Sequence, residues 1–252
     1  MRGIAGFVLA LLIAACGRPS RAGDFDGWTV AVVSGDWRSG DGKPIQAFDN
    51  ARTELASAFA RSGFKSSEVR QYALRPLADP ARPEPMVVKP IDIARNFTAA
   101  GLAGAKGCLF YVTSHGSPKG AVFGPDMTLT PYMLDRLLSE ACGDKPTVAV
   151  VSACFSGVFV PGLAKPNRMV MTAAREDRSS FGCGEGDRYP FFDACVLESL
   201  PEVGDFIALS RRVKTCVARR ETEQKLSPPS EPQVWVGSEA QIVLPLLRFE
   251  RN

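Results

Sequence analysis

The only histidine of the chain and one of its seven cysteines occupy corresponding places after apolar runs. His115 follows the run 108–113, and Cys154 follows the run 147–151. A thiolate attacks a carbonyl carbon far better than a thiol does, so a nucleophilic cysteine needs a partner for its proton. A histidine can accept that proton and later return it to a departing amine. These residue types at these places predict a cysteine nucleophile with a histidine partner.

Apolar runs alternate with amphipathic segments along most of the chain. The runs that predict buried strands cover 28–33, 108–113, 147–151, 169–172 and 233–236. The segments with apolar residues at helical spacing cover 48–59, 91–102, 131–141, 191–200 and 206–217. This alternation predicts a mostly parallel sheet with helices on both faces. In such a sheet the working site lies beyond the carboxyl ends of the strands, where His115 and Cys154 are expected.

Three local signals complete the predicted elements. Residues 74–90 include five prolines and are expected to form an extended surface loop. Residues 174–189 are polar and rich in glycine, which predicts a second long loop. Thr130-Pro131 predicts a sharp helix start, with the threonine as the cap and the proline in the first turn.

The composition is that of an ordinary globular protein. Of 252 residues, 45% are hydrophobic and 23% are charged, which allows one α/β domain or two small ones with a sizeable core. The net charge of +3 is too small to indicate nucleic acid as a partner. The cysteines include no Cys-x-x-Cys pair and the single histidine already has a role, so no zinc site is expected. We expect neither a metal nor a cofactor.

The amino terminus has the features of a targeting segment. Arg2 supplies positive charge, and the apolar run 7–15 is too short to span a bilayer as a helix. Small residues then precede Cys16, which resembles the processing site of a bacterial lipoprotein. Cys16 would then become the lipid-carrying first residue of the mature chain. The alternative is a plain secretion signal cut near Ala15 or Ala22.

These features predict three parts: a signal peptide at 1–15, a tether at 16–27 and one folded domain at 28–252. The protein is expected in the cell envelope, held by its lipid to a bacterial membrane and facing the periplasm. Gly17 favours the outer membrane over the inner one, because an aspartate there often retains lipoproteins at the inner membrane.

Export implies an oxidising compartment, in which disulfides can form. With Cys16 lipidated and Cys154 catalytic, the cysteines that remain are Cys108, Cys142, Cys183, Cys195 and Cys216. Five is odd, so at least one of them stays free. Cys183 and Cys195 bracket a polar loop and are expected to form a bridge. Alternatively, several of these cysteines are simply small buried hydrophobic residues.

The sequence resembles the caspase-fold cysteine peptidases, and among them most closely the legumain (asparaginyl endopeptidase) family. The motifs that carry the resemblance are His115-Gly116 and Ala153-Cys154-Phe155-Ser156-Gly157. A third match joins Ser179-Ser180-Phe181-Gly182-Cys183 to the later Phe191-Phe192-Asp193. The resemblance covers most of residues 28–237. It implies a caspase-like three-layer sandwich with a mostly parallel six-stranded sheet.

The resemblance also implies an activity and the residues that perform it. The protein would be a cysteine endopeptidase that hydrolyses peptide bonds through an acyl-enzyme, with Cys154 as nucleophile and His115 as its partner. The backbone N–H groups of Gly116 and Cys154 would stabilise the negative oxygen of the tetrahedral intermediate.

Further residues are implied for substrate binding. Ser179 and Ser180 would line the cleft, although loop serines are usually just solvated. Asp193 would be a pocket acid, which favours a polar or basic substrate side chain; its other interpretation is a cap for the helix near Pro190. The expected partners are a protein or peptide substrate and, through the lipid anchor, a membrane.

The sequence also departs from the family pattern. Phe155 replaces the acidic residue that follows the nucleophile in legumain, and the loop 36–46 offers no clear counterpart to the family's specificity arginine. The family's preference for asparagine or aspartate is therefore left open. Two alternative functions remain: a transpeptidase or transamidase that uses the same dyad, and a non-catalytic binding module that kept the fold.

Overall fold

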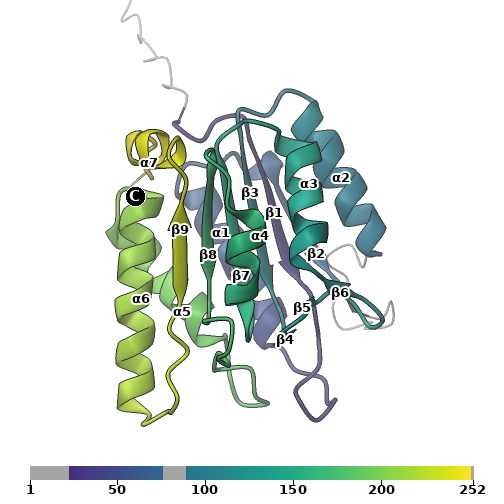
Figure 1. The fold of residues 1–252 in the computed structure, drawn as a ribbon, viewed down its shortest axis with the longest axis vertical. Helices are drawn as coiled ribbons and strands as arrows, with labels where there is room; N and C mark the ends of the chain where they lie inside the picture. The colour runs from purple at the N-terminus through teal and green to yellow at the C-terminus, as the bar shows by residue number, and fades with distance from the viewer. Residues whose placement is uncertain (1–22, 76–88, 251–252) are drawn as a thin grey trace, which may run out of the picture.

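The computed structural model describes residues 23–75 and 89–250 (Figure 1). The predicted signal peptide at 1–15, the lipidation residue Cys16 and most of the proline-containing segment 74–90 lie outside the described residues. Within the described part, no helix is both long enough and apolar enough to cross a membrane.

A six-stranded sheet forms the centre of the fold, in the order β2-β1-β3-β7-β8-β9. In chain order its strands are β1 (Trp28–Ser34), β2 (Val69–Ala73), β3 (Gly107–Thr113), β7 (Thr147–Ser152), β8 (Arg168–Thr172) and β9 (Gln233–Val236). The strands β2, β1, β3, β7 and β8 are parallel to one another, and β9 runs antiparallel to β8. The predicted mostly parallel six-stranded sheet is confirmed.

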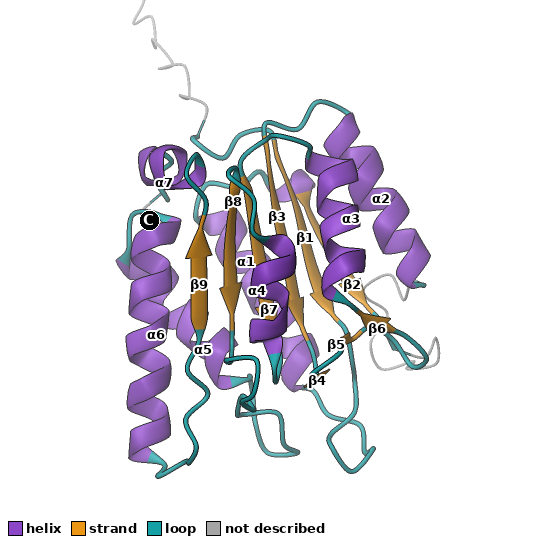
Figure 2. Cartoon of the chain, viewed as in Figure 1, coloured by secondary structure: helices purple, strands orange, loops and turns teal. Residues whose placement is uncertain are grey.

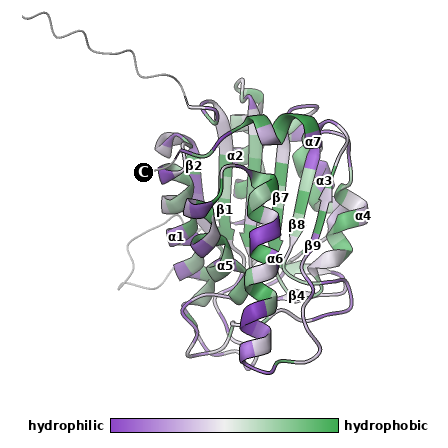
Figure 3. Cartoon of the chain, turned by 90° about the vertical axis from the view of Figure 1, so that its left-hand side faces the viewer, coloured by the Kyte–Doolittle hydropathy of each residue, from purple (hydrophilic) through white to green (hydrophobic). Residues whose placement is uncertain are grey.

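Helices cover both faces of this sheet (Figure 2). One face carries α1 (Ala47–Arg61), α5 (Phe191–Ser199) and α6 (Phe206–Glu223), and the other carries α2 (Pro90–Leu102), α3 (Pro131–Cys142) and α4 (Phe159–Leu163). Along β1, Val30 and Val32 pack into the first layer, while Ala31 and Val33 pack into the second. Successive side chains of a strand point to opposite faces, so a strand covered on both sides is apolar throughout. Figure 3 shows these hydrophobic strands between the helices. The three-layer sandwich is confirmed.

Short elements complete the fold. A small antiparallel sheet follows β3 and consists of β4 (Gly116–Ser117), β5 (Gly120–Val122) and β6 (Thr128–Leu129). The others are the short helix α7 (Ala240–Val243) and 3-10 turns at Ser66–Glu68, Ser156–Val158, Leu200–Glu202 and Leu244–Leu246. Neither the small sheet nor β2 was predicted, because these segments are short and lack a continuous apolar run.

The predicted start of α3 is confirmed. The Thr130 hydroxyl accepts a hydrogen bond from the Met133 N–H at 3.3 Å, and Pro131 is the first helical residue. The predicted loop 74–90 needs correction at both ends. Leu74 is buried, and Pro90 begins α2, where a proline loses no helical hydrogen bond.

The predicted tether also needs correction in its described part. Phe25 is fully buried and stacks on Phe64 and Phe249, with ring centroids 4.3 and 5.3 Å away. Burial of an aromatic ring contributes substantially to a core, so this residue belongs to the folded domain. The folded domain therefore includes residues 23–27, ahead of the boundary that we predicted at residue 28.

Two disulfides join helices to neighbouring elements, and neither is the predicted Cys183–Cys195 bridge. Cys108 of β3 pairs with Cys142 of α3, and Cys195 of α5 pairs with Cys216 of α6. Cys183 is free, as is Cys154. Cys183 and Cys195 are close in the sequence, but Cys195 lies on α5 with its side chain toward α6, where it bonds to Cys216.

Candidate active site

The pairing of β3 with β7 sets the level of His115 and Cys154. The two strands are parallel, with Thr113 opposite Ser152, and the Ser114 N–H donates to the Ser152 carbonyl at 3.0 Å. His115 lies two residues past Thr113, and Cys154 lies two residues past Ser152. Parallel strands in register carry corresponding residues at the same height. The two predicted residues therefore leave the same edge of the sheet from neighbouring strands.

Gly116 brings the histidine segment directly against the cysteine segment. A Cβ atom at this position would lie 2.0 Å from the Cys154 carbonyl oxygen and 3.0 Å from the Ala153 Cβ. Any side chain would force the two backbones apart, so this close approach requires glycine. The His-Gly motif thus has a steric reason, independent of any catalytic role.

A backbone carbonyl and an aromatic ring orient the half-buried His115 side chain. Its Nε2 lies 2.7 Å from the Arg38 carbonyl oxygen, and its ring packs nearly perpendicular to the Phe48 ring, with centroids 5.0 Å apart. A carbonyl only accepts hydrogen bonds, so Nε2 carries the proton, and in the neutral ring Nδ1 is left as the acceptor. Arg38 could not be found from the sequence, because every residue supplies a carbonyl. This contact identifies the loop after β1 as part of the site.

Cys154 is half-buried and lies against Ser180. The Ser180 N–H donates to Sγ at 3.3 Å, and the carbonyl and hydroxyl oxygens of Ser180 each lie 3.6 Å from Sγ. The sulfur therefore has both a donor and two acceptor oxygens of Ser180 beside it. No hydrogen bond joins Sγ to the His115 ring. Catalytic hydrogen bonds commonly tighten only when substrate is bound, so this leaves a direct proton transfer open.

The backbone turns sharply just after Cys154. Phe155 adopts a left-handed conformation, with φ of 58°, and its N–H donates to the Arg178 carbonyl at 2.7 Å. Non-glycine residues rarely adopt this conformation, and they do so mostly where the surrounding structure enforces it. The Cβ position of Gly157 lies only 2.4 Å from the Glu176 backbone nitrogen. The loop after β8 is thus packed closely against the turn that carries the cysteine.

The two predicted cleft serines differ in their surroundings. Ser180 lies against the Cys154 sulfur, whereas Ser179 is exposed to solvent. The structure therefore brings Ser180 to the candidate nucleophile, and it gives Ser179 no comparable contact with Cys154.

Asp193 is fully buried and does not line a cleft, in contrast to the predicted pocket acid. Its carboxylate accepts hydrogen bonds from the hydroxyls of Tyr111, Thr113 and Ser152. It does not cap α5 either: it is in the first turn, and its side chain points to β3 and β7. Burial raises the pKa of this carboxyl to about 6, although the three hydroxyls act in the opposite direction.

The second free cysteine has a different environment from Cys154. Cys183 packs against Ile45 and Phe48. Burial, with a smaller contribution from the nearby Cys154 and Asp187, raises the pKa of its thiol to about 11. At neutral pH Cys183 is therefore protonated and a poor nucleophile.

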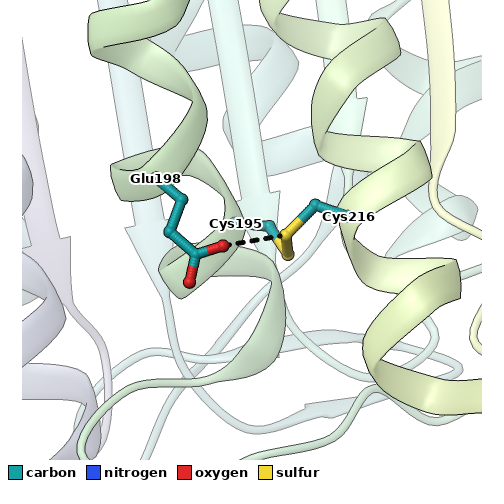
Figure 4. A group of neighbouring side chains, drawn as sticks. All are labelled: Cys195, Glu198 and Cys216. Atoms are coloured by element: carbon teal, nitrogen blue, oxygen red, sulfur yellow. Dashed lines mark hydrogen bonds between the residues drawn. A yellow bond between two sulfur atoms is a disulfide. The ribbon is translucent and has the colours of Figure 1, made fainter. Parts of the chain in front are cut away.

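A group with metal-ligating residue types lies elsewhere, between α5 and α6. Cys195, Glu198 and Cys216 come together there (Figure 4). The two sulfurs are bonded to each other, so neither is a thiolate ligand. Arg219 and Arg220 pair with the Glu198 carboxylate. Among the described residues, this arrangement fits a structural disulfide beside an ion pair rather than a metal centre.

Comparisons with known proteins agree with this geometry. Residues 107–202, which include both His115 and Cys154, match the sequence model of the Peptidase C13 family. The structure is similar to that of caspase-1 from Spodoptera frugiperda, with a TM-score of 0.61 and 14% sequence identity. That similarity covers 91% of this chain and 94% of the caspase chain, and at this identity it establishes the fold. No curated protein matches the sequence. The family match over this central segment and the shared fold together support a legumain-like cysteine peptidase with the caspase fold.

Proposed function

We propose that the protein is an endopeptidase in which Cys154 is the nucleophile and His115 is its proton acceptor. The observation that carries the proposal is the shared register of β3 and β7, which sends both residues from one edge of the sheet. The contact of the His115 ring with the Arg38 carbonyl supports the assignment, because it leaves Nδ1 as the basic nitrogen.

The first half of the reaction forms a thioester. The Cys154 proton moves to Nδ1 of His115, and the thiolate attacks the carbonyl carbon of the scissile peptide bond. The Ser180 N–H stabilises the thiolate before the attack. The carbon–nitrogen bond then breaks, and the imidazolium gives its proton to the departing amine. The acyl group remains on the Cys154 sulfur.

The backbone N–H groups of Gly116 and Cys154 are the proposed donors to the negative oxygen of the intermediate. Support for Gly116 comes from the small sheet. The Val122 N–H donates to the His115 carbonyl at 2.8 Å, so His115 and Val122 form a hydrogen-bonded pair. Such pairs alternate in antiparallel ladders, which makes Gly116 and Ala121 the non-bonded pair. The Gly116 N–H therefore points away from β5 and remains available for substrate.

The second half of the reaction releases the acyl group. His115 takes a proton from water, the hydroxide attacks the thioester, and the sulfur leaves as a thiolate that regains its proton. A peptide amine that replaced the water would give a transpeptidase instead. The proposed substrate is an exposed segment of a protein or peptide. Because Asp193 is buried, it gives no support to a preference for basic side chains.

We also propose that the protein is exported and lipid-anchored to a bacterial membrane through Cys16. The sequence around Cys16 motivates this proposal. The two disulfides support it, because structural disulfides persist in oxidising compartments such as the periplasm. The packing of Phe25 leaves residues 17–22 between the anchor and the folded domain.

Peptide mapping tests the activity. The purified protein is incubated with a mixture of unrelated peptides, and cut or joined products are mapped by mass spectrometry. We expect cut products from the wild type and from Cys183→Ala, which removes the other free cysteine. We expect none from Cys154→Ala or His115→Ala.

Each alternative gives a distinct result. Joined peptides would establish transfer rather than hydrolysis. Equal turnover by Cys154→Ala and wild type would overturn the assignment of the nucleophile. No turnover of any peptide, together with an unreactive Cys154 thiol, would favour the non-catalytic binding module.

A further inference from the structure

Asp193 connects the two strands that carry the proposed dyad. The Tyr111 hydroxyl of β3 donates to its carboxylate at 2.6 Å, and the Thr113 hydroxyl donates to the other carboxylate oxygen. The Ser152 hydroxyl of β7 provides a third hydrogen bond. One carboxylate thus holds side chains from two neighbouring strands.

These hydrogen bonds lie at the ends of the strands, next to the site. Thr113 and Ser152 are the last residues of β3 and β7 and face each other across the ladder. Only one residue separates each from His115 or Cys154. A shift of either strand end therefore moves a proposed catalytic side chain directly.

Burying the Asp193 carboxylate in the core is unfavourable for folding. Asp193 is fully buried, and among the described residues its partners are hydroxyl groups, with no lysine, arginine or histidine in an ion pair with it. A buried carboxylate without a cation costs folding free energy unless hydrogen bonds compensate for its lost hydration. An apolar side chain would fill this space without that cost. The arrangement therefore calls for an explanation beyond core packing.

We propose that Asp193 is a positioning residue, whose carboxylate fixes the ends of β3 and β7 and thereby sets the relative placement of His115 and Cys154. This inference rests on the proposed function of that dyad. Asp193 itself touches no substrate, because its side chain is fully enclosed. Its position in the first turn of α5 connects the alignment of the dyad to the packing of that helix.

Asp193→Asn tests the proposal with little change in shape. The amide keeps one oxygen acceptor but replaces the other with a donor, so it cannot accept all three hydroxyls. We expect kcat per active site to fall about tenfold to a hundredfold, as for misplacement of a reacting group, while KM stays within about twofold. The alkylation rate of Cys154 by iodoacetamide should fall with kcat.

Thr113→Val and Ser152→Ala are the second pair of variants, in case Asp193→Asn does not fold. Each removes one hydroxyl and leaves the carboxyl in place, and each should lower kcat in the same sense. The matched control is Asp135→Asn, which breaks an ion pair with Arg168 and Lys165 at the opposite end of β8. It should lower the melting temperature and leave kcat per active site unchanged.

The outcomes separate this inference from the proposed function. If Asp193→Asn behaves like Asp135→Asn, with lower stability and unchanged kcat and alkylation, the residue is only structural and the inference is overturned. If the wild type shows no Cys154-dependent turnover, the proposed function fails. The alkylation rates then still decide whether Asp193 controls the environment of the Cys154 thiol.

Discussion

At the scale of single residues, the hydrogen bond of the His115 ring goes to a backbone atom rather than to a side chain. The Arg38 carbonyl accepts the hydrogen bond of the His115 ring. The Asp36 carboxylate stabilises the loop that contains this carbonyl, because it accepts hydrogen bonds from the N–H groups of Trp37 and Arg38 at 2.7 and 3.2 Å. The Arg38 guanidinium pairs with the same carboxylate and lies over the Trp37 ring, and neither interaction involves His115. The identity of the side chain at position 38 should therefore matter less than the shape of the loop.

This gives a prediction from two neighbouring substitutions. Arg38→Ala keeps the carbonyl and the two loop hydrogen bonds, so kcat should stay within a few-fold of wild type. Asp36→Ala removes both hydrogen bonds, and kcat should fall by about tenfold because the imidazole is less well placed. Steady-state kinetics on a peptide substrate measures both. A greater loss in Arg38→Ala than in Asp36→Ala would contradict the role of the carbonyl.

The buried carboxyl of Asp193 predicts a pH dependence of stability. Its pKa is raised from the ordinary value of 3.8 to about 6 in the folded protein. Between these values the folded state binds more protons than the unfolded chain, so the free energy of unfolding falls as pH rises through this window. The decrease from this group is at most about 3 kcal/mol.

Urea unfolding of wild type and Asp193→Asn at several pH values between 4 and 7 isolates this contribution. The free energy of unfolding of the wild type, measured relative to that of Asp193→Asn, should decrease as pH increases. A difference that does not change with pH would show that the carboxyl titrates normally.

Residue types and positions revealed some of the site in advance. His115 and Cys154 were predictable because each follows an apolar run. The Arg38 carbonyl was not, because a backbone acceptor leaves no mark on the sequence. The contacts of Asp193 were not predictable either, since they come from two strands far away along the chain.

At the scale of elements, long apolar runs were predictable and short edge elements were not. β3 and β7 are covered on both faces, so each is apolar along nearly its whole length. β2 is the outer strand of the sheet and is only partly buried, with sequence Val-Arg-Gln-Tyr-Ala. Pairing with β1 supplies its hydrogen bonds, and tertiary context of this kind overrides local propensity.

The disulfides connect elements that local sequence does not place together, and they predict the state of the cysteines. Thiol titration of the denatured protein that begins at residue 23 should find two free thiols, Cys154 and Cys183. Replacing Cys195 and Cys216 together by serine should cost about 3 kcal/mol of unfolding free energy, measured in urea. Cys183→Ser should cost much less. Six free thiols, or equal losses in the two variants, would contradict this pairing.

At the scale of the whole molecule, the three-layer fold presents the site at one edge of the sheet. The first core residues, including Phe25, lie before β1, at its amino end. Because β1 and β3 are parallel, the carboxyl ends that carry the site lie at the opposite edge. The described part of the chain therefore begins at the edge of the sheet opposite His115 and Cys154.

The proposed anchor has a direct test in bacterial cells that express the full chain. The wild-type protein should be recovered in the membrane fraction, and mass spectrometry of its first mature peptide should find lipid on Cys16. Cys16→Ser should move the protein to the soluble fraction or leave it unprocessed. An unmodified wild-type chain that begins after Ala22 would instead establish a plain secretion signal.

The central claim is that Cys154 is the reactive thiol and that His115 makes it so. The most direct measurement is the alkylation rate of each cysteine in the folded protein at neutral pH, followed by peptide mass spectrometry. Cys154 should react much faster than Cys183, whose thiol has its pKa raised to about 11. His115→Ala should slow Cys154 at least about tenfold. Equal rates for the two cysteines, or a Cys154 rate that is unchanged in His115→Ala, would contradict the account.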